Sequence, residues 1–190
     1  MTKMVTILTQ GYADWETALL NAAARSYYGI ETKFATPRGA PVTSSGGLTV
    51  TPDLAIEDID VDDIDVLLVN GGSAWEQADA PDVSEVIRKA VSGGKIVGGI
   101  CAGTVALARA GVLDNVRHTS NSADTLAQTQ YKGAALYQDV PRAVSDKRII
   151  TAPGTAPVSF MSAVMEALGL KDENLDFYLG LHAAEHRAAA

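Results

Sequence analysis

The single cysteine of the chain, Cys101, lies in the pentapeptide GICAG at residues 99–103. This is the pattern G-x-C-x-G, the thiol counterpart of the G-x-S-x-G elbow, in which a sharp turn between a strand and a helix holds a nucleophile above a sheet. Backbone N–H groups at the start of the following helix should favour the thiolate and lower the pKa of the thiol from about 8.5. A free cysteine is more often a small buried apolar residue, so the spacing alone leaves both interpretations open.

A carboxyl group that could act with this thiol is Glu16, in the segment GYADWE. It follows the candidate N-cap Asp14 by two residues and therefore lies in the first turn of a predicted helix. A carboxylate beside a thiolate is repulsive, so one of the two should hold a proton, and burial favours the carboxyl as its site. Protonated Glu16 would then donate to the sulfur. The alternative is that Glu16 only complements the helix dipole, which is worth about 0.3–1 kcal/mol.

Backbone amides near the thiol could stabilise negative charge that develops on a substrate oxygen. We expect the amides of Ala102 and Gly72 to do so, with Gly71 beside them in the segment NGGS. Trp15 and Trp75 are predicted to wall the pocket, although an aromatic side chain at either position could be ordinary core.

These groups come directly after predicted strands, in a chain where strands and helices alternate. Short apolar segments typical of buried strands occupy residues 4–9, 32–37, 64–70, 95–100 and 148–153. Apolar residues at helical spacing occupy 14–29, 80–94, 103–113, 155–170 and 172–190, and a further helix is expected within 118–129. The alternation predicts an α/β fold with a doubly wound, mostly parallel sheet flanked by helices on both faces, a flavodoxin-like sandwich. Ligands of such sheets bind outside the carboxyl ends of the strands, where Cys101 and Glu16 are expected.

Glycine and proline mark some of the predicted boundaries. Gly29 is the expected end of the first helix, and Pro157 lies in the first turn of a later one. Residues 46–59 interrupt the alternation and are predicted to form a small hairpin excursion.

Composition narrows the classes of function. A length of 190 residues predicts one domain over residues 1–190. The formal charge of −8 and the scattered Lys and Arg argue against binding to nucleic acid or an anionic membrane. One thiol without a partner and no signal-peptide pattern predict a cytoplasmic protein. The acidic tract at 56–65 is interpreted as a solvated connection, and its carboxylates are expected to have no basic neighbours to pair with.

Three segments together resemble the ThiJ/PfpI superfamily, which includes the parkinsonism-associated protein deglycase, bacterial intracellular proteases and amidases, and isonitrile hydratases. They are VLLVNGGSAWE, GGICAGTVALARAGVL and RIITAPGTAPVSFMSAVMEALG, and the resemblance spreads over residues 4–168. It implies that Cys101 is the nucleophile at the elbow, that Glu16 is the carboxyl hydrogen-bonded to it, and that the protein forms a homodimer.

The sequence departs from this family at the histidine that many members carry near the nucleophile. Ala102 follows the cysteine directly, and Asn121 aligns where several relatives have histidine. His118 is a possible substitute, but on a short strand it would point to the opposite side from Thr119. Asn121 is instead expected to orient a substrate oxygen.

A reaction that needs only a thiolate and one carboxyl remains possible without the histidine. We therefore predict a cysteine-dependent hydrolase or lyase that acts on a small carbonyl compound, in the manner of a glyoxalase or deglycase, without a cofactor. One alternative is a redox-sensing or stress-protective protein that works through oxidation of Cys101. The other is a small amidase of the glutamine amidotransferase type or an enzyme like isonitrile hydratase.

Two further patterns are set aside. The segment HAAEH, from His182 to His186, has the spacing of a zinc motif. It lies at the end of the last predicted helix without an evident third ligand, so no metal site is predicted. The loop TQGYADWE has one glycine and two acidic residues where a phosphate-binding loop needs glycines and hydroxyls, which argues against a nucleotide site.

Overall fold

The computed structural model describes residues 1–184, and the predicted fold class is confirmed. A seven-stranded sheet has the order β5-β2-β1-β6-β7-β9-β8, in which only the edge strand β8 runs antiparallel to its neighbour. Its strands are β1 (Lys3–Ile7), β2 (Glu31–Thr36), β5 (Leu54–Ala55), β6 (Val66–Val69), β7 (Ile96–Ile100), β8 (Val144–Asp146) and β9 (Ile149–Ala152).

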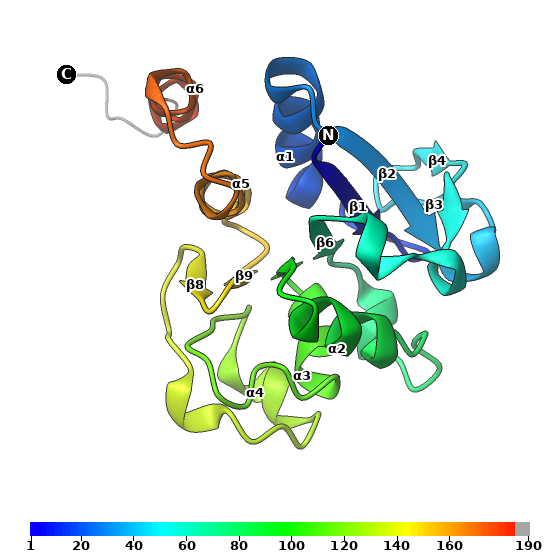
Figure 1. The fold of residues 1–190 in the computed structure, drawn as a ribbon. Helices are drawn as coiled ribbons and strands as arrows, with labels where there is room; N and C mark the ends of the chain where they lie inside the picture. Colours follow the sequence, from blue (N-terminus) through cyan, green and yellow to red (C-terminus); the bar gives the residue numbers. More distant parts are fainter. Residues whose placement is uncertain (185–190) are drawn as a thin grey trace.

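Helices cover both faces of this sheet. The helices are α1 (Asp14–Tyr28), α2 (Ser84–Ser92), α3 (Gly103–Arg109), α4 (Ala123–Ala127), α5 (Pro157–Ala167) and α6 (Glu173–Ala184). Figure 1 shows α1, α5 and α6 on one side and α2, α3 and α4 on the other. Because parallel strands need crossover connections, this two-sided cover is the expected consequence of the strand–helix alternation.

Strand residues alternate between two apolar cores. In β6, Leu67 and Val69 belong to the core that includes α2 and α3, whereas Val66 and Leu68 belong to the core that includes α1 and α5. All four side chains are fully buried. Burial on both faces fixes the register of the central strands, because a shift by one residue would exchange the two sets of side chains.

The boundaries of α1 differ in one respect from the prediction. Gly29 ends the helix in the left-handed conformation, with φ of 62°, as expected. The N-cap, however, is Ala13, and the prediction of Asp14 as the N-cap is wrong. The Asp14 carboxylate instead accepts a hydrogen bond from the backbone N–H of Gly46, at 2.8 Å between Oδ2 and N. The carboxylate therefore anchors a distant loop to the start of α1.

The predicted excursion is only partly a hairpin. β3 (Val42–Thr43) and β4 (Thr49–Val50) form a separate antiparallel pair. The following strand β5 pairs in parallel with β2 and so belongs to the main sheet.

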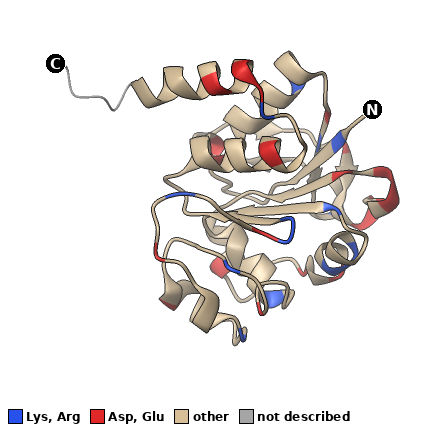
Figure 2. Cartoon of the chain, turned by 60° about the vertical axis from the view of Figure 1, so that its left-hand side comes forward, with Lys and Arg blue, Asp and Glu red and all other residues tan. Residues whose placement is uncertain are grey.

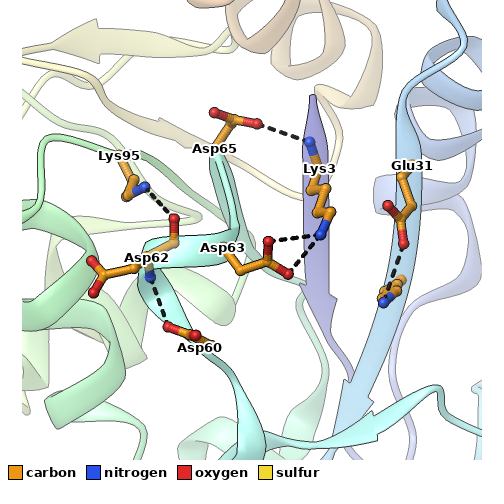
Figure 3. Close-up of polar contacts among 8 residues, drawn as sticks. Lys3, Glu31, Asp60, Asp62, Asp63, Asp65 and Lys95 are labelled. Atoms are coloured by element: carbon orange, nitrogen blue, oxygen red, sulfur yellow. Dashed lines mark hydrogen bonds and ion pairs between the residues drawn. The ribbon is translucent and has the colours of Figure 1, made fainter. Parts of the chain in front are cut away.

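The acidic tract has basic partners, contrary to the prediction. Lys3 Nζ lies 2.6 Å from Asp63 Oδ2, and the backbone N–H of Lys3 donates to Asp65 Oδ2 at 2.9 Å (Figure 3). Lys95 Nζ donates to the Asp62 carbonyl oxygen at 3.3 Å. These lysines come from β1 and from the residue before β7, so the sequence near the tract gives no sign of them. Exposed ion pairs of this kind contribute little to stability.

Charges are dispersed over the rest of the chain. Figure 2 shows Lys and Arg on several separate elements, interspersed with Asp and Glu. Among the described residues, no helix has both the length and the apolar character needed to cross a membrane.

Candidate active site

The chain turns sharply at Cys101, between the end of β7 and the start of α3. Cys101 has φ of 55°, in the left-handed region that residues other than glycine seldom adopt. The Cys101 N–H donates to the carbonyl of Ala152 at 2.9 Å, so the ladder between β7 and β9 holds the strand side of the turn. A Cβ at Gly103 would overlap the Val69 carbonyl, so the helix side needs glycine there. The half-buried thiol is thus held above the sheet in a strained turn, as in nucleophile elbows.

Glu16 lies in the first turn of α1 and is fully buried. Its Oε2 accepts a hydrogen bond from the backbone N–H of Gly71 at 2.7 Å. Its Oε1 has no hydrogen-bond partner apart from the neighbouring Cys101 thiol. A Cβ built on Gly154 would lie 2.9 Å from both Glu16 Oε1 and Cys101 Sγ. The two groups therefore face the same small space, which only glycine leaves open.

Burial governs the protonation of this pair. It raises the pKa of Glu16 from 4.5 to about 7, opposed by the hydrogen bonds from Cys101 and the Gly71 amide. Burial also raises the pKa of the Cys101 thiol to about 11; the hydrogen bond from Asn121 acts against this rise, and the charge of Glu16 adds to it. The expectation that the helix start lowers the thiol pKa is therefore wrong, because desolvation and the carboxylate outweigh it.

Glu16 and Cys101 titrate together, because a charge on either one disfavours a charge on the other. Between about pH 7 and pH 11 the pair holds one proton and one negative charge. Hydrogen bonds from Asn121 and from the Ala102 amide stabilise that charge on sulfur, and the one from Gly71 stabilises it on the carboxylate. The site can therefore present a thiolate beside a protonated carboxyl without a basic residue.

Asn121 occupies the position beside the sulfur that the sequence assigned to a missing histidine. Its Nδ2 donates to Cys101 Sγ at 3.1 Å. Its Oδ1 accepts from the Gly154 N–H at 2.9 Å, which fixes the amide so that its NH₂ group faces the sulfur. The Asn121 side chain is thus a fixed hydrogen-bond donor.

An open depression with a volume of about 690 Å³ lies above the thiol. Its lining consists of Trp15, Glu16, Cys101, Asn121, Pro153, Gly154, Thr155 and Pro157. The Trp15 side chain is 56% exposed, and its Nε1 donates to the Gly154 carbonyl at 3.0 Å. The expected role of Trp15 as a wall residue thus agrees with its location.

Other predicted site residues lie elsewhere or have different contacts. Trp75 is fully buried in the core, with its Nε1 donating to the Asn70 carbonyl at 2.7 Å, and it does not line the depression. The amide of Gly71 is engaged by Glu16 rather than available to a substrate oxygen. Gly72 pairs with Tyr12 in an antiparallel bridge. The Ala102 amide donates to the sulfur, and its expected role as a donor to a substrate oxygen stays a prediction.

The two described histidines, His118 and His182, do not line the depression above the thiol. His118 is fully buried, with Nδ1 2.8 Å from the Val116 carbonyl oxygen and Nε2 3.2 Å from the Tyr131 hydroxyl. Burial lowers the pKa of His118. His182 stacks edge-on against Tyr178 in α6, with ring centroids 4.8 Å apart, while His186 lies outside the described residues. The described residues hold no group of acidic, histidine or cysteine side chains suited to a metal.

Sequence reasoning missed Asn70, which follows β6 directly. Its Nδ2 donates to the carbonyls of Ala13 and Gly71, at 3.0 and 2.9 Å. Asn70 thereby holds the carbonyl of Gly71, the residue whose N–H donates to Glu16. A buried amide directly after an apolar strand was the available signal, because a buried polar group must find hydrogen-bond partners.

Burial of Glu16 predicts a pH-dependent stability. A folded-state pKa raised from 4.5 to about 7 means that the stabilising contribution of the protonated carboxyl is complete below about pH 4.5 and is lost as the pH rises through 7. Glu16→Gln removes this titration, while its amide oxygen can still accept from Gly71. The free energy of unfolding of Glu16→Gln, relative to the unaltered protein, should therefore increase by roughly 2–3 kcal/mol between pH 5 and pH 8.

Urea denaturation at a series of pH values measures this difference. Glu173→Gln, on the exposed first turn of α6, is the matched control for the loss of one carboxyl outside the site. A pH dependence for Glu16→Gln no larger than that of the control would show that burial does not raise the pKa of the Glu16 carboxyl.

Comparison with known proteins places this geometry in a family. The model that describes the DJ-1/PfpI family matches residues 2–167. A solved DJ-1 superfamily protein from Agrobacterium tumefaciens is 46% identical, with a TM-score of 0.96 over 98% of this chain and 100% of that one. A glutathione-independent glyoxalase of Caenorhabditis elegans, DJR-1.2, is 31% identical over 74% of each chain. The uncharacterized protease YoaZ of Bacillus subtilis is 32% identical, and the match spans 67% of this chain and 61% of that protein. The chain belongs to the DJ-1/PfpI family, as its sequence motifs predicted.

Proposed function

We propose that the protein converts a small α-oxoaldehyde, such as methylglyoxal, into the corresponding 2-hydroxy acid without a cofactor. Cys101 is the nucleophile and Glu16 carries the proton. One arrangement supports this function above all: a buried carboxyl and a half-buried thiol share a proton at the floor of an open depression. The similarity to a protein named as a glutathione-independent glyoxalase supports the same reaction. We further propose that it acts as a homodimer in the cytoplasm, as the family resemblance and the unpaired thiol imply.

The first step forms a hemithioacetal. Cys101 Sγ, as thiolate, adds to the aldehyde carbon, and the resulting alkoxide takes the proton held by Glu16. Asn121 and the Ala102 amide stabilise the thiolate before the attack. The strained turn keeps the sulfur exposed to the depression, so no rearrangement is needed for the substrate to approach.

The second step moves a hydrogen between the two carbonyl carbons. Glu16, now a carboxylate, removes the proton from the former aldehyde carbon and returns it to the neighbouring ketone carbon, while the hydroxyl proton on the first carbon passes to the oxygen on the second. The first carbon is oxidised to a thioester and the second is reduced to an alcohol, so no external oxidant or reductant takes part. Water then hydrolyses the thioester, which releases the 2-hydroxy acid and restores the thiol. A carboxyl with a pKa of about 7 suits both proton transfers at neutral pH.

The measurement is the formation of lactate from methylglyoxal, followed by nuclear magnetic resonance. We expect lactate to form in proportion to the protein concentration. Protein whose Cys101 has first been alkylated with iodoacetamide is the control and should be inactive. Equal rates with free and alkylated protein would contradict the proposed reaction.

The alternative function, sensing of peroxide through Cys101, is favoured by one observation. The half-buried sulfur lies between Asn121 and Glu16, which could both donate hydrogen bonds to a sulfinate. Mass spectrometry after mild peroxide treatment tests it: clean conversion to sulfinate in a protein that forms no lactate would favour the sensor. Amidase chemistry is disfavoured, because no histidine lies among the described residues that line the depression to protonate a leaving amine.

A further inference from the structure

We propose that the depression above Cys101 selects uncharged carbonyl compounds with an apolar substituent and rejects those that carry a carboxylate or phosphate. The chemistry of the carbonyl rests on the proposed function above. The selection by charge is a property of the site itself and can be measured without turnover.

The first observation is the charge of the lining. Glu16 is its only acidic residue, and none of the described residues that line the depression is basic. The hydrogen-bond donors around the pair, Asn121 and the Gly71 amide, are neutral. No described ion pair involves Glu16. The negative charge that the pair carries therefore meets no nearby cation.

The second observation is that Asn121 and the Gly71 amide, which contact the pair, already donate hydrogen bonds to it. Asn121 gives its NH₂ group to the sulfur and its oxygen to Gly154. The Gly71 N–H is donated to Glu16. An anionic group entering the depression would lose its hydration and approach a buried negative charge in a region of low effective dielectric, where repulsion is strong.

The third observation concerns the walls. Pro153 and Pro157 are apolar, and Trp15 adds an exposed aromatic surface that is held in place by its hydrogen bond to Gly154. Because the indole N–H is occupied, the remaining surface of this side chain offers only apolar contact. Such walls favour a methyl or phenyl group beside the carbonyl over a charged one.

A matched pair of alkylating agents tests the selection by charge. Iodoacetamide and iodoacetate have nearly the same size and differ by one negative charge. We expect the ratio of their rates with Cys101 at pH 8 to exceed the ratio measured with 2-mercaptoethanol by at least about tenfold, a factor that corresponds to 1.4 kcal/mol. The same ratio for Cys101 and for 2-mercaptoethanol would overturn the proposal.

Two further measurements identify the cause. Both reagents react only with the thiolate, and Glu16 then holds the one proton of the pair, so both rates should fall from pH 8 to pH 6 while their ratio stays the same. Thr155→Lys, which adds a cation at the exposed edge of the depression, should bring the ratio down towards that of 2-mercaptoethanol, whereas Asn174→Lys, on the exposed start of α6, should leave it high. A ratio that Thr155→Lys leaves unchanged would contradict the proposal that the absence of a cation causes the selection.

The outcome is independent of the proposed reaction. A high ratio in a protein that forms no lactate would support the selection by charge and overturn only the glyoxalase reaction. A ratio equal to that of 2-mercaptoethanol, in a protein that does form lactate, would leave the reaction in place and overturn the selection.

Discussion

Replacing Cys101 with serine should lower the rate of lactate formation from methylglyoxal by a factor on the order of 10³ or more. Serine fits the same turn, but its hydroxyl is a weak nucleophile unless a base removes its proton. Among the described residues, Glu16 is the only titratable side chain beside the sulfur, and its pKa of about 7 lies far below that of an alcohol. The serine variant therefore lacks any means of generating an oxyanion nucleophile.

Steady-state rates and thermal unfolding of the variant check this prediction together. Cys101→Ala is the companion variant, because it removes the nucleophile without adding a hydroxyl group. Both should unfold at a temperature close to that of the unaltered protein, since Cys101 is only half-buried. Retention of more than about a tenth of the activity by a folded serine variant would mean that the sulfur is not the attacking atom.

The fold could be predicted because local patterns agree with the global arrangement. The buried strand at 64–70 and the turn at Cys101 could both be predicted, because in each case an apolar run ends at small residues. Alternation of strands and helices predicts a parallel sheet, in which the carboxyl ends of the strands lie at the same edge. This reasoning placed Glu16 and Cys101 at the same end of the sheet, although they are far apart in the sequence, and the family resemblance implied that they act as a pair.

The electrostatics of the site could not be predicted in the same way. The pKa of Cys101 depends on how much water reaches the sulfur and on how deeply Glu16 is buried, and both depend on packing between distant segments. Gly154 illustrates this, because its lack of a side chain makes the space that the two groups share. In the sequence it is one glycine among 17.

Long-range polar contacts account for the other differences. The ion pair of Asp63 with Lys3 joins residues 60 positions apart, which no local pattern reveals. For Trp75 the sequence leaves a pocket wall and ordinary core as alternatives, and the structure places its side chain in the core. Its indole N–H is satisfied by the Asn70 carbonyl, which makes complete burial acceptable.

Glu16→Gln should reduce the rate of lactate formation by about 10²–10⁴-fold and change its dependence on pH. In the unaltered protein, kcat/KM should fall about tenfold per unit below pH 7, because the pair then holds two protons and the sulfur is a thiol. The carboxamide of the variant cannot exchange protons in this way, so the step between the two carbonyl carbons loses its carrier. The inflection near pH 7 should disappear, and the residual rate should rise only at higher pH, as the desolvated thiol ionises alone.

Profiles of kcat/KM and of alkylation of Cys101 by iodoacetamide separate the two effects of this change. Loss of the inflection in both profiles would assign it to the pair, because alkylation requires the thiolate but no proton carrier. Glu16→Asp provides the matched comparison, since it keeps the carboxyl but shortens the side chain by one methylene group. The profile of kcat/KM for Glu16→Asp should still fall at acid pH, with a lower maximal value than that of the unaltered protein. If Glu16→Gln kept an inflection near pH 7 in both profiles, the titrating group would be another residue, and the shared proton could not be the basis of the reaction.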